Sequence, residues 1–180
     1  MALTATVYQL GVELSDTDRG VYETLALRAA CHPSESADFL ATRLLAYCLE
    51  YEEGIGFSGG GVSEGDEPAI AVRDPAGRIR AWIEVGWPDA ARLHKAAKAA
   101  ERVAVYSVKE ARGLLRQLEG QRIHRAEEIP IYSFDRELVD GLTARLDRRT
   151  QMQMTVSSRE IYLTAGGESW SGSVREQRLG

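Results

Sequence analysis

A hairpin followed at once by a basic helix is the feature that most constrains the fold of this chain. An apolar segment at 69–72 ends in Asp-Pro-Ala-Gly at 74–77, residues that favour a tight turn. A second apolar segment, 79–83, then returns along the first. Residues 88–100 follow as an alanine-rich helix with Pro88 in its first turn, where proline is well tolerated.

Carboxylates gather at the open end of this hairpin. Pairing Arg73 with Arg78 across the turn places position 67 opposite Glu84, with Asp66 beside them. Carboxylates on strands supply the oxygen ligands that divalent metals take, and a nearby cation stabilises charge on a phosphate. The pattern predicts metal-dependent phosphodiester chemistry. The alternative interpretation is a solvated strand entrance with ordinary exposed acids.

The helix that follows carries the cations. Arg92 and Lys95 share one helical stripe with Pro88, whereas Lys98 lies on another stripe. We therefore expect Lys95, rather than Lys98, to point toward the carboxylates. The alternative is a wet helix face; His94, on the same helix, is expected to be exposed.

Bulk properties indicate one domain covering residues 1–180. A chain of 180 residues with 44% hydrophobic and 27% charged residues can bury a substantial core. No run has the length of a membrane span, and the N-terminus lacks the basic and then apolar pattern of a signal region. We expect a cytoplasmic protein that does not enter membranes, with Cys31 and Cys48 as reduced thiols.

The distribution of charge is more informative than its sum. A net charge of -5 argues against a protein that coats nucleic acid nonspecifically. Residues 73–125, however, contain 12 Lys and Arg against 6 Asp and Glu, whereas residues 1–72 contain 3 against 12. The basic segment either presents a surface for a polyanion or consists of exposed helix faces that balance the acidic first third.

The remaining elements predict an α/β fold, with a mixed β-sheet flanked by helices and β-hairpins added at both ends. Interior parallel strands are expected after the helices. Pro130 makes an interior position less favourable for the strand at 129–134. The predicted strands are 4–14, 20–30, 102–106, 129–134, 150–156, 160–164 and 169–174, and further helices run from Ser34 to about 51, over 108–119 and over 135–146.

The glycines at 54–61 lack the Lys-Ser/Thr ending of a phosphate-binding loop, so we exclude nucleotide binding there.

Glu35 has two interpretations. Ser34 is the expected N-cap of the first helix, which places Glu35 in the first turn, where the helix dipole favours a carboxylate. Alternatively, Glu35 is an auxiliary acidic ligand of the metal site.

Five short motifs of the chain are familiar from a known family: His-Pro-Ser-Glu at 32–35, Arg-Leu-Leu-Ala at 43–46, Asp-Glu-Pro at 66–68, Ile-Glu-Val-Gly-Trp-Pro-Asp at 83–89 and Arg-Leu-His-Lys-Ala at 92–96. They carry a resemblance to the YaeQ family of small bacterial proteins. It extends over nearly the whole chain, and it implies a restriction-endonuclease-like fold of the PD-(D/E)XK type.

The resemblance also implies roles for individual residues. Asp66 matches the first metal-binding aspartate and Glu84 the acidic residue of the D/E-X-K element, so these two would hold Mg²⁺. Position 86 is glycine, where the strand lysine is usual, and Lys95 on the following helix is the best substitute, with Arg92 able to reach the same phosphate. The implied catalytic residues are thus Asp66, Glu84 and Lys95, and the auxiliary residues Glu35, Glu67 and Arg92.

Two functions follow for a family that has no established one. The first is a Mg²⁺-dependent nuclease, with water as the nucleophile. The second is a non-catalytic module on a nuclease-like scaffold that binds nucleic acid or a protein, because a fold does not dictate a function. In either case we expect a monomer or weak oligomer.

Overall fold

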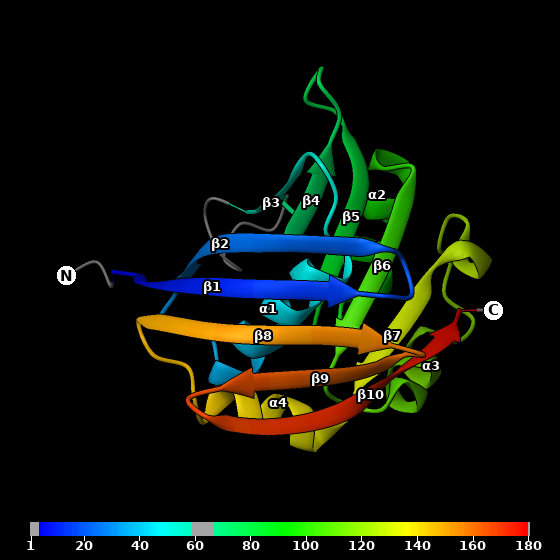
Figure 1. Ribbon diagram of the computed structural model, residues 1–180. Helices are drawn as coiled ribbons and strands as arrows, with labels where there is room; N and C mark the ends of the chain where they lie inside the picture. Colours follow the sequence, from blue (N-terminus) through cyan, green and yellow to red (C-terminus); the bar gives the residue numbers. More distant parts are fainter. Residues whose placement is uncertain (1–3, 59–66, 180) are drawn as a thin grey trace.

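The structure, a computed structural model, describes residues 4–58 and 67–179. Its ten described strands form one sheet in the order β2-β1-β8-β9-β10-β7-β6-β5-β4-β3 (Figure 1). The strands are β1 Thr6–Asp16, β2 Val21–Cys31, β3 Ile55–Phe57, β4 Ile70–Arg73, β5 Ile79–Val85, β6 Arg102–Ser107, β7 Pro130–Phe134, β8 Arg149–Ser157, β9 Glu160–Ala165 and β10 Glu168–Arg178. The helices of this part of the chain are α1 Ala37–Leu49, α2 Ala90–Ala99, α3 Ala111–Leu118 and α4 Arg136–Thr143, with a short 3₁₀ helix at Ala126–Glu128. None of these helices has the length and apolar character needed to cross a membrane.

The sheet is mixed, as predicted, but its terminal hairpins are not separate additions. Strand β1 pairs in parallel with β8, with Gln9 opposite Arg149. Strand β10 pairs with β9 and also with β7, where Val174 lies opposite Phe134. The N- and C-terminal strands therefore continue the central sheet, in which β5, β6 and β7 run parallel as expected.

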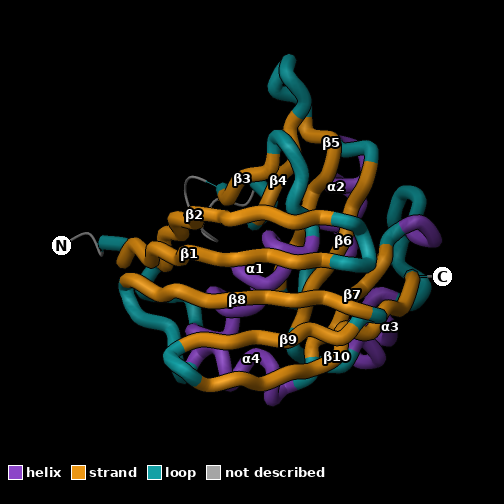
Figure 2. Tube along the Cα trace, viewed as in Figure 1, coloured by secondary structure: helices purple, strands orange, loops and turns teal. Residues whose placement is uncertain are grey.

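The two faces of the sheet carry different helices. In Figure 2, strands β1 and β8 pass in front of α1, and β9 and β10 pass in front of α4. Residues of β1, β2, β8 and β9, of both helices and of β4–β6 share one hydrophobic core. A second core lies on the other face, between the central strands and the helices α2 and α3. Because side chains alternate along a strand, Ile83 of β5 enters the first core and Trp82 enters the second.

Two local predictions are wrong. Helix α1 begins after Ser36, whose Oγ accepts a hydrogen bond from the Phe39 N–H at 3.1 Å, so Ser36 and not Ser34 is the N-cap. Glu35 therefore precedes the helix. Strand β7 is interior, between β6 and β10; its Pro130 is the first residue of the strand, a position that proline tolerates.

The β4–β5 hairpin forms around the predicted turn, but with a different register. The Asp74 N–H donates to the Arg78 carbonyl at 2.9 Å, and Arg73 pairs with Ile79 instead of Arg78. A bulge at Val72/Arg73 shifts the register again, so that Ile70 pairs with Ile83. Position 67 is therefore not opposite Glu84.

Both cysteines are free thiols, as predicted. Burial raises the pKa of the fully buried Cys48 to about 12, and burial together with the nearby Glu35 carboxylate raises the pKa of the half-buried Cys31. Because the raised pKa favours the neutral thiol, Cys48 stabilises the fold at pH values below 9.0, and this contribution is lost as the pH rises through about 12.

We expect a disulfide-exchange reagent at pH 8 to leave Cys48 unmodified in the native protein and to modify Cys31 slowly, since the thiolate is the reactive species. Both should react at once in urea. Mass spectrometry of the labelled peptides assigns each site, and a Cys48→Ala variant isolates the reaction of Cys31. Rapid modification of Cys48 before unfolding would contradict the burial described above.

Candidate functional site

Glu84 is a buried acid near the carboxyl end of β5. It is 4% exposed and lies two residues after Trp82, so both side chains leave the sheet on the face that α2 covers. A carboxylate at this depth needs hydrogen-bond donors, because burying an unpaired charge is costly.

Two donors converge on one oxygen of Glu84. Its Oε1 accepts hydrogen bonds from the Trp82 Nε1 at 2.5 Å and from the Arg92 Nε at 2.7 Å. Arg92 is held in place by the start of α2, where the Asp89 carboxylate caps the helix and accepts the Arg92 backbone N–H at 2.8 Å. The strand and the helix that follows it are thus joined by an ion pair whose acid is buried and whose arginine is partly exposed.

Arg92 also binds the chain that leads into β4. Its Nη2 donates to the Glu67 carbonyl oxygen at 2.7 Å. Glu67 therefore comes to the site, but through its backbone and not through a carboxylate facing Glu84. One guanidinium connects β5, α2 and the approach to β4.

Burial raises the pKa of the Glu84 carboxyl. The hydrogen bond from Trp82 and the charge of Arg92 act in the opposite direction, but they do not outweigh the loss of water around the carboxylate. Arg92 keeps 27% of its side chain exposed, so part of its field is screened by solvent.

The other predicted residues are distributed as follows. Asp66 lies outside the described residues. Lys95 and Lys98 are both exposed on α2, and Arg92 is the residue of this helix that forms an ion pair with Glu84. Glu35 is not brought to this site: its carboxylate is buried on the α1 side of the sheet, 3.6 Å from the Arg43 Nη2.

A metal at this site would need a ligand besides Glu84. Within residues 4–58 and 67–179, no group of three or more His, Cys, Asp or Glu side chains is arranged to hold a metal ion. Both donors to Glu84 bind Oε1, so Oε2 is the oxygen suited to a cation. The described residues therefore fit one carboxylate of the predicted pair, and Asp66 is the residue that would supply the other.

Sequence reasoning missed the partners of Glu84. The signals were present: Trp82 and Glu84 are two apart on a strand, and Asp89 stands three residues before Arg92, the spacing of an N-cap. It also missed a second buried acid, Glu50, which binds the Tyr106 hydroxyl and the Arg102 guanidinium, each at 2.7 Å. No local pattern predicts a contact between residues 56 positions apart.

The fold and the site together define a class: a mixed α/β protein with a buried acid–arginine pair between a central strand and the next helix. The YaeQ protein family model matches residues 1–173. The chain belongs to the YaeQ family. The YaeQ proteins of Escherichia coli K12 and Shigella flexneri, both uncharacterised, are each 32% identical to it over 166 residues, which cover 91% of either chain.

Two solved YaeQ structures have the same fold. The crystal structure from Pseudomonas syringae superposes with a TM-score of 0.84 at 29% identity, covering 98% of this chain and 96% of that one. The crystal structure from Xanthomonas axonopodis pv. citri gives a TM-score of 0.88 at 27% identity, covering 98% and 100%. The likeness therefore extends over both halves of the sheet.

Proposed function

We propose that this chain is a Mg²⁺-dependent phosphodiesterase of the nuclease type that acts on nucleic acid, on a restriction-endonuclease-like core. One observation carries the proposal: Glu84 lies one residue before the end of a central strand, is buried, and faces the helix that bears Arg92 and Lys95. An acid on a strand with cations on the next helix is the variant PD-(D/E)XK arrangement that the family resemblance implies.

Each residue has a distinct part in this proposal. Glu84 and Asp66 hold the metal, and Lys95 stabilises negative charge on the scissile phosphate. Arg92 is a positioning residue that orients Glu84 through Nε and the approach to β4 through Nη2. When bound, Mg²⁺ would polarise the phosphate and activate water.

The test is cleavage of labelled single- and double-stranded DNA and RNA by purified protein with Mg²⁺ or Mn²⁺. We expect Glu84→Gln to lower the cleavage rate by at least about 100-fold, since the amide keeps the shape but loses the charge that holds the cation. Lys95→Met should lower turnover and leave metal affinity, measured by calorimetry, much less affected.

The matched control is Glu50→Gln. Glu50 is also a buried acid with one arginine and one aromatic donor, yet it lies in a separate cluster with Arg102 and Tyr106. Both variants disturb an ion pair formed by a buried acid, so a loss that follows only Glu84→Gln reports on chemistry and not on folding. Measurable metal binding without Glu84-dependent cleavage of any substrate would overturn the proposal that this chain is a phosphodiesterase.

A second function is favoured by the ion pair itself. Trp82 and Arg92 already occupy Oε1 of Glu84, which is how a purely structural acid is satisfied. In that case the chain is a non-catalytic module that binds nucleic acid or a protein. It would bind its partner equally well with and without Mg²⁺, and Glu84→Gln would change stability alone.

A further inference from the structure

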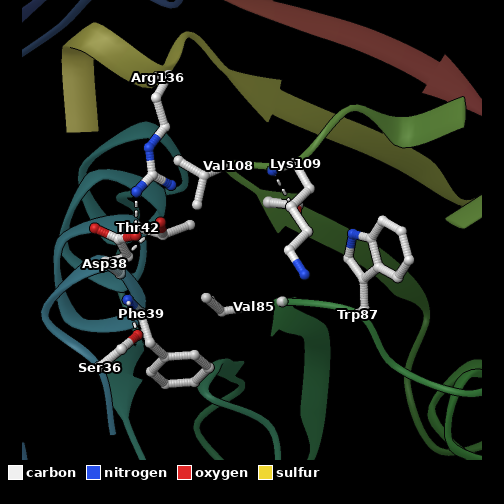
Figure 3. Close-up of a pocket in the computed structure, with 11 residues that line it drawn as sticks. Ser36, Asp38, Phe39, Thr42, Val85, Trp87, Val108, Lys109 and Arg136 are labelled. Carbon is white, nitrogen blue, oxygen red and sulfur yellow. Dashed lines mark hydrogen bonds and ion pairs between the residues drawn. The ribbon is translucent and has the colours of Figure 1, made fainter. Parts of the chain in front are cut away.

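A pocket of about 220 Å³ opens at the carboxyl ends of β5 and β6, on the sheet face opposite Glu84. Figure 3 shows its walls: Phe39 and Thr42 of α1 on one side, Trp87 on the other, and Val85 and Lys109 between them. Ligands of α/β proteins commonly bind at this edge of parallel strands. The pocket therefore merits a functional explanation of its own.

Trp87 forms an open aromatic wall. It follows β5 through Gly86, whose φ of 98° turns the chain out of the sheet, and it is 39% exposed. Its indole reaches α3, where a Cβ built on Gly113 would lie only 2.6 Å from the indole Cη2. The missing side chain at position 113 thus gives the ring room to lie against α3 while much of it stays accessible.

Lys109 brings the uncompensated charge of the pocket. Its ammonium lies 5.0 Å from the centre of the Trp87 ring, and it makes no ion pair with any residue in the described part of the chain. Arg136, the other cation of the lining, is already bonded to the Asp38 carboxylate at 2.6 Å. An anion entering the pocket would therefore be attracted to Lys109.

We propose that this pocket binds one nucleotide unit, with its base stacked on Trp87 and its phosphate bound by Lys109. A volume of about 220 Å³ is below the roughly 300–1,000 Å³ of pockets for drug-sized ligands, so it limits the ligand to a single nucleotide unit. The cation–π contact between Lys109 and Trp87 is weak because the site is exposed. A ligand that carries a base and a phosphate can therefore replace this contact with two stronger ones. The base takes the ring face and the phosphate takes the ammonium.

The pocket identifies the class of nucleic acid as single-stranded, and this step rests on the proposed function. A base within a duplex is already stacked and paired, whereas an unpaired base can lie on an aromatic side chain. Val85 lines the pocket and follows Glu84 in the chain, so the bound nucleotide would lie at the same strand end as Glu84 but on the other face of the sheet.

The experiment measures binding in EDTA by fluorescence anisotropy, so it does not depend on cleavage. The probes are a labelled 12-nucleotide oligothymidylate and its duplex with oligoadenylate; thymidine monophosphate and thymidine are the competitors. We expect the single strand to bind at least about tenfold more tightly than the duplex. Trp87→Ala and Lys109→Gln should each weaken binding of the single strand by about tenfold.

Two control variants match these changes. Tyr162→Ala removes another exposed aromatic side chain, 48% exposed on β9, and Lys98→Gln removes an exposed lysine of α2. Neither should change the affinity for the single strand. Because Lys109 is exposed, its substitution tests the pocket even if Trp87→Ala folds poorly.

The outcomes separate the sources of the nucleotide. Competition by thymidine monophosphate but not by thymidine supports a pocket for base plus phosphate. A monophosphate that binds as tightly as the oligonucleotide overturns the assignment to nucleic acid and assigns the pocket to a free nucleotide. If Trp87→Ala, Lys109→Gln and the unaltered protein bind the single strand with equal affinity, the proposal that this pocket binds a nucleotide is overturned. The proposed function fails separately, when the unaltered protein binds the strand but does not cleave it with Mg²⁺.

Discussion

Replacing Arg43 by methionine is expected to lower the free energy of unfolding by about 3–5 kcal/mol. The side chain of Arg43 is 1% exposed and that of Glu35 is fully buried, so the substitution leaves a carboxylate out of water without its cation. The remaining donor to Glu35 in the described structure is the His32 N–H, at 3.3 Å from Oε1. Urea unfolding followed by circular dichroism measures the loss.

The arrangement of this pair makes the prediction sharper. The Glu35 Oε2 and the Arg43 Nε have no hydrogen-bond partner among the described residues. The Arg43 Nη2 lies 3.6 Å from the Glu35 Oε2 but donates its hydrogen bond to the Ala30 carbonyl at 2.6 Å, so the two charges attract each other without a direct hydrogen bond. Removing both charges, with Glu35→Leu and Arg43→Met together, should therefore restore most of the stability that either change loses. Arg78→Met, which removes an 83% exposed side chain from its ion pair with Asp74, should cost no more than about 1 kcal/mol. Additive losses in the double variant would show that the pair is not coupled.

The second large effect is expected for Gly54→Ala, which should lower the free energy of unfolding by about 2–5 kcal/mol. Gly54 has a φ of 93°, and a Cβ at this position would lie 2.2 Å from the Arg73 carbonyl oxygen, which belongs to the backbone and cannot turn away. Its own carbonyl accepts the Arg73 N–H at 2.9 Å, so the same contact fastens β3 to β4. Thermal and urea unfolding of the variant test the loss.

Gly77 provides the matched control. Its φ of 86° is similar, but a Cβ there would meet nothing within 4 Å. Gly77→Ala should therefore cost only the conformational strain, about 1–3 kcal/mol. The difference between the two variants measures the steric clash at Gly54, and equal losses would contradict it.

Much of the local structure was predictable because its signals are local. The alternation in β1 and β8, the turn at 74–77 and the small-residue face of α2 each reflect a period of 2 or 3.6 residues that burial imposes. The buried residues of α2 are Leu93, Ala96 and Ala97, whose spacing of three and four residues places them on one face of the predicted alanine-rich helix. These elements occur where the sequence analysis places them, within a few residues.

Long-range pairings were not predictable, because no local signal in the sequence specifies them. The parallel pairing of β1 with β8 joins residues about 140 positions apart. The alternation of buried and exposed residues in either strand does not indicate which strand it pairs with. The predicted register of β4–β5 was lost first at the turn, where Arg73 pairs with Ile79, and again at the Val72/Arg73 bulge, where one added residue changes all pairs beyond it. The Glu84–Arg92 pair lies between these cases: its two residues are near in sequence, but their contact requires the strand and the helix to be packed first.

The position of β1 in the sheet has a consequence for how the molecule is made. During synthesis β1 and β2 leave the ribosome first, but β8, the other neighbour of β1, begins at residue 149. The edge of β1 that does not pair with β2 therefore stays uncovered until most of the chain has been translated. Contacts of such long sequence separation slow folding and keep an unpaired strand exposed meanwhile. The newly made protein is thus expected to be most vulnerable to aggregation just before its last strands emerge, and chaperones that cover nascent strands should raise its yield.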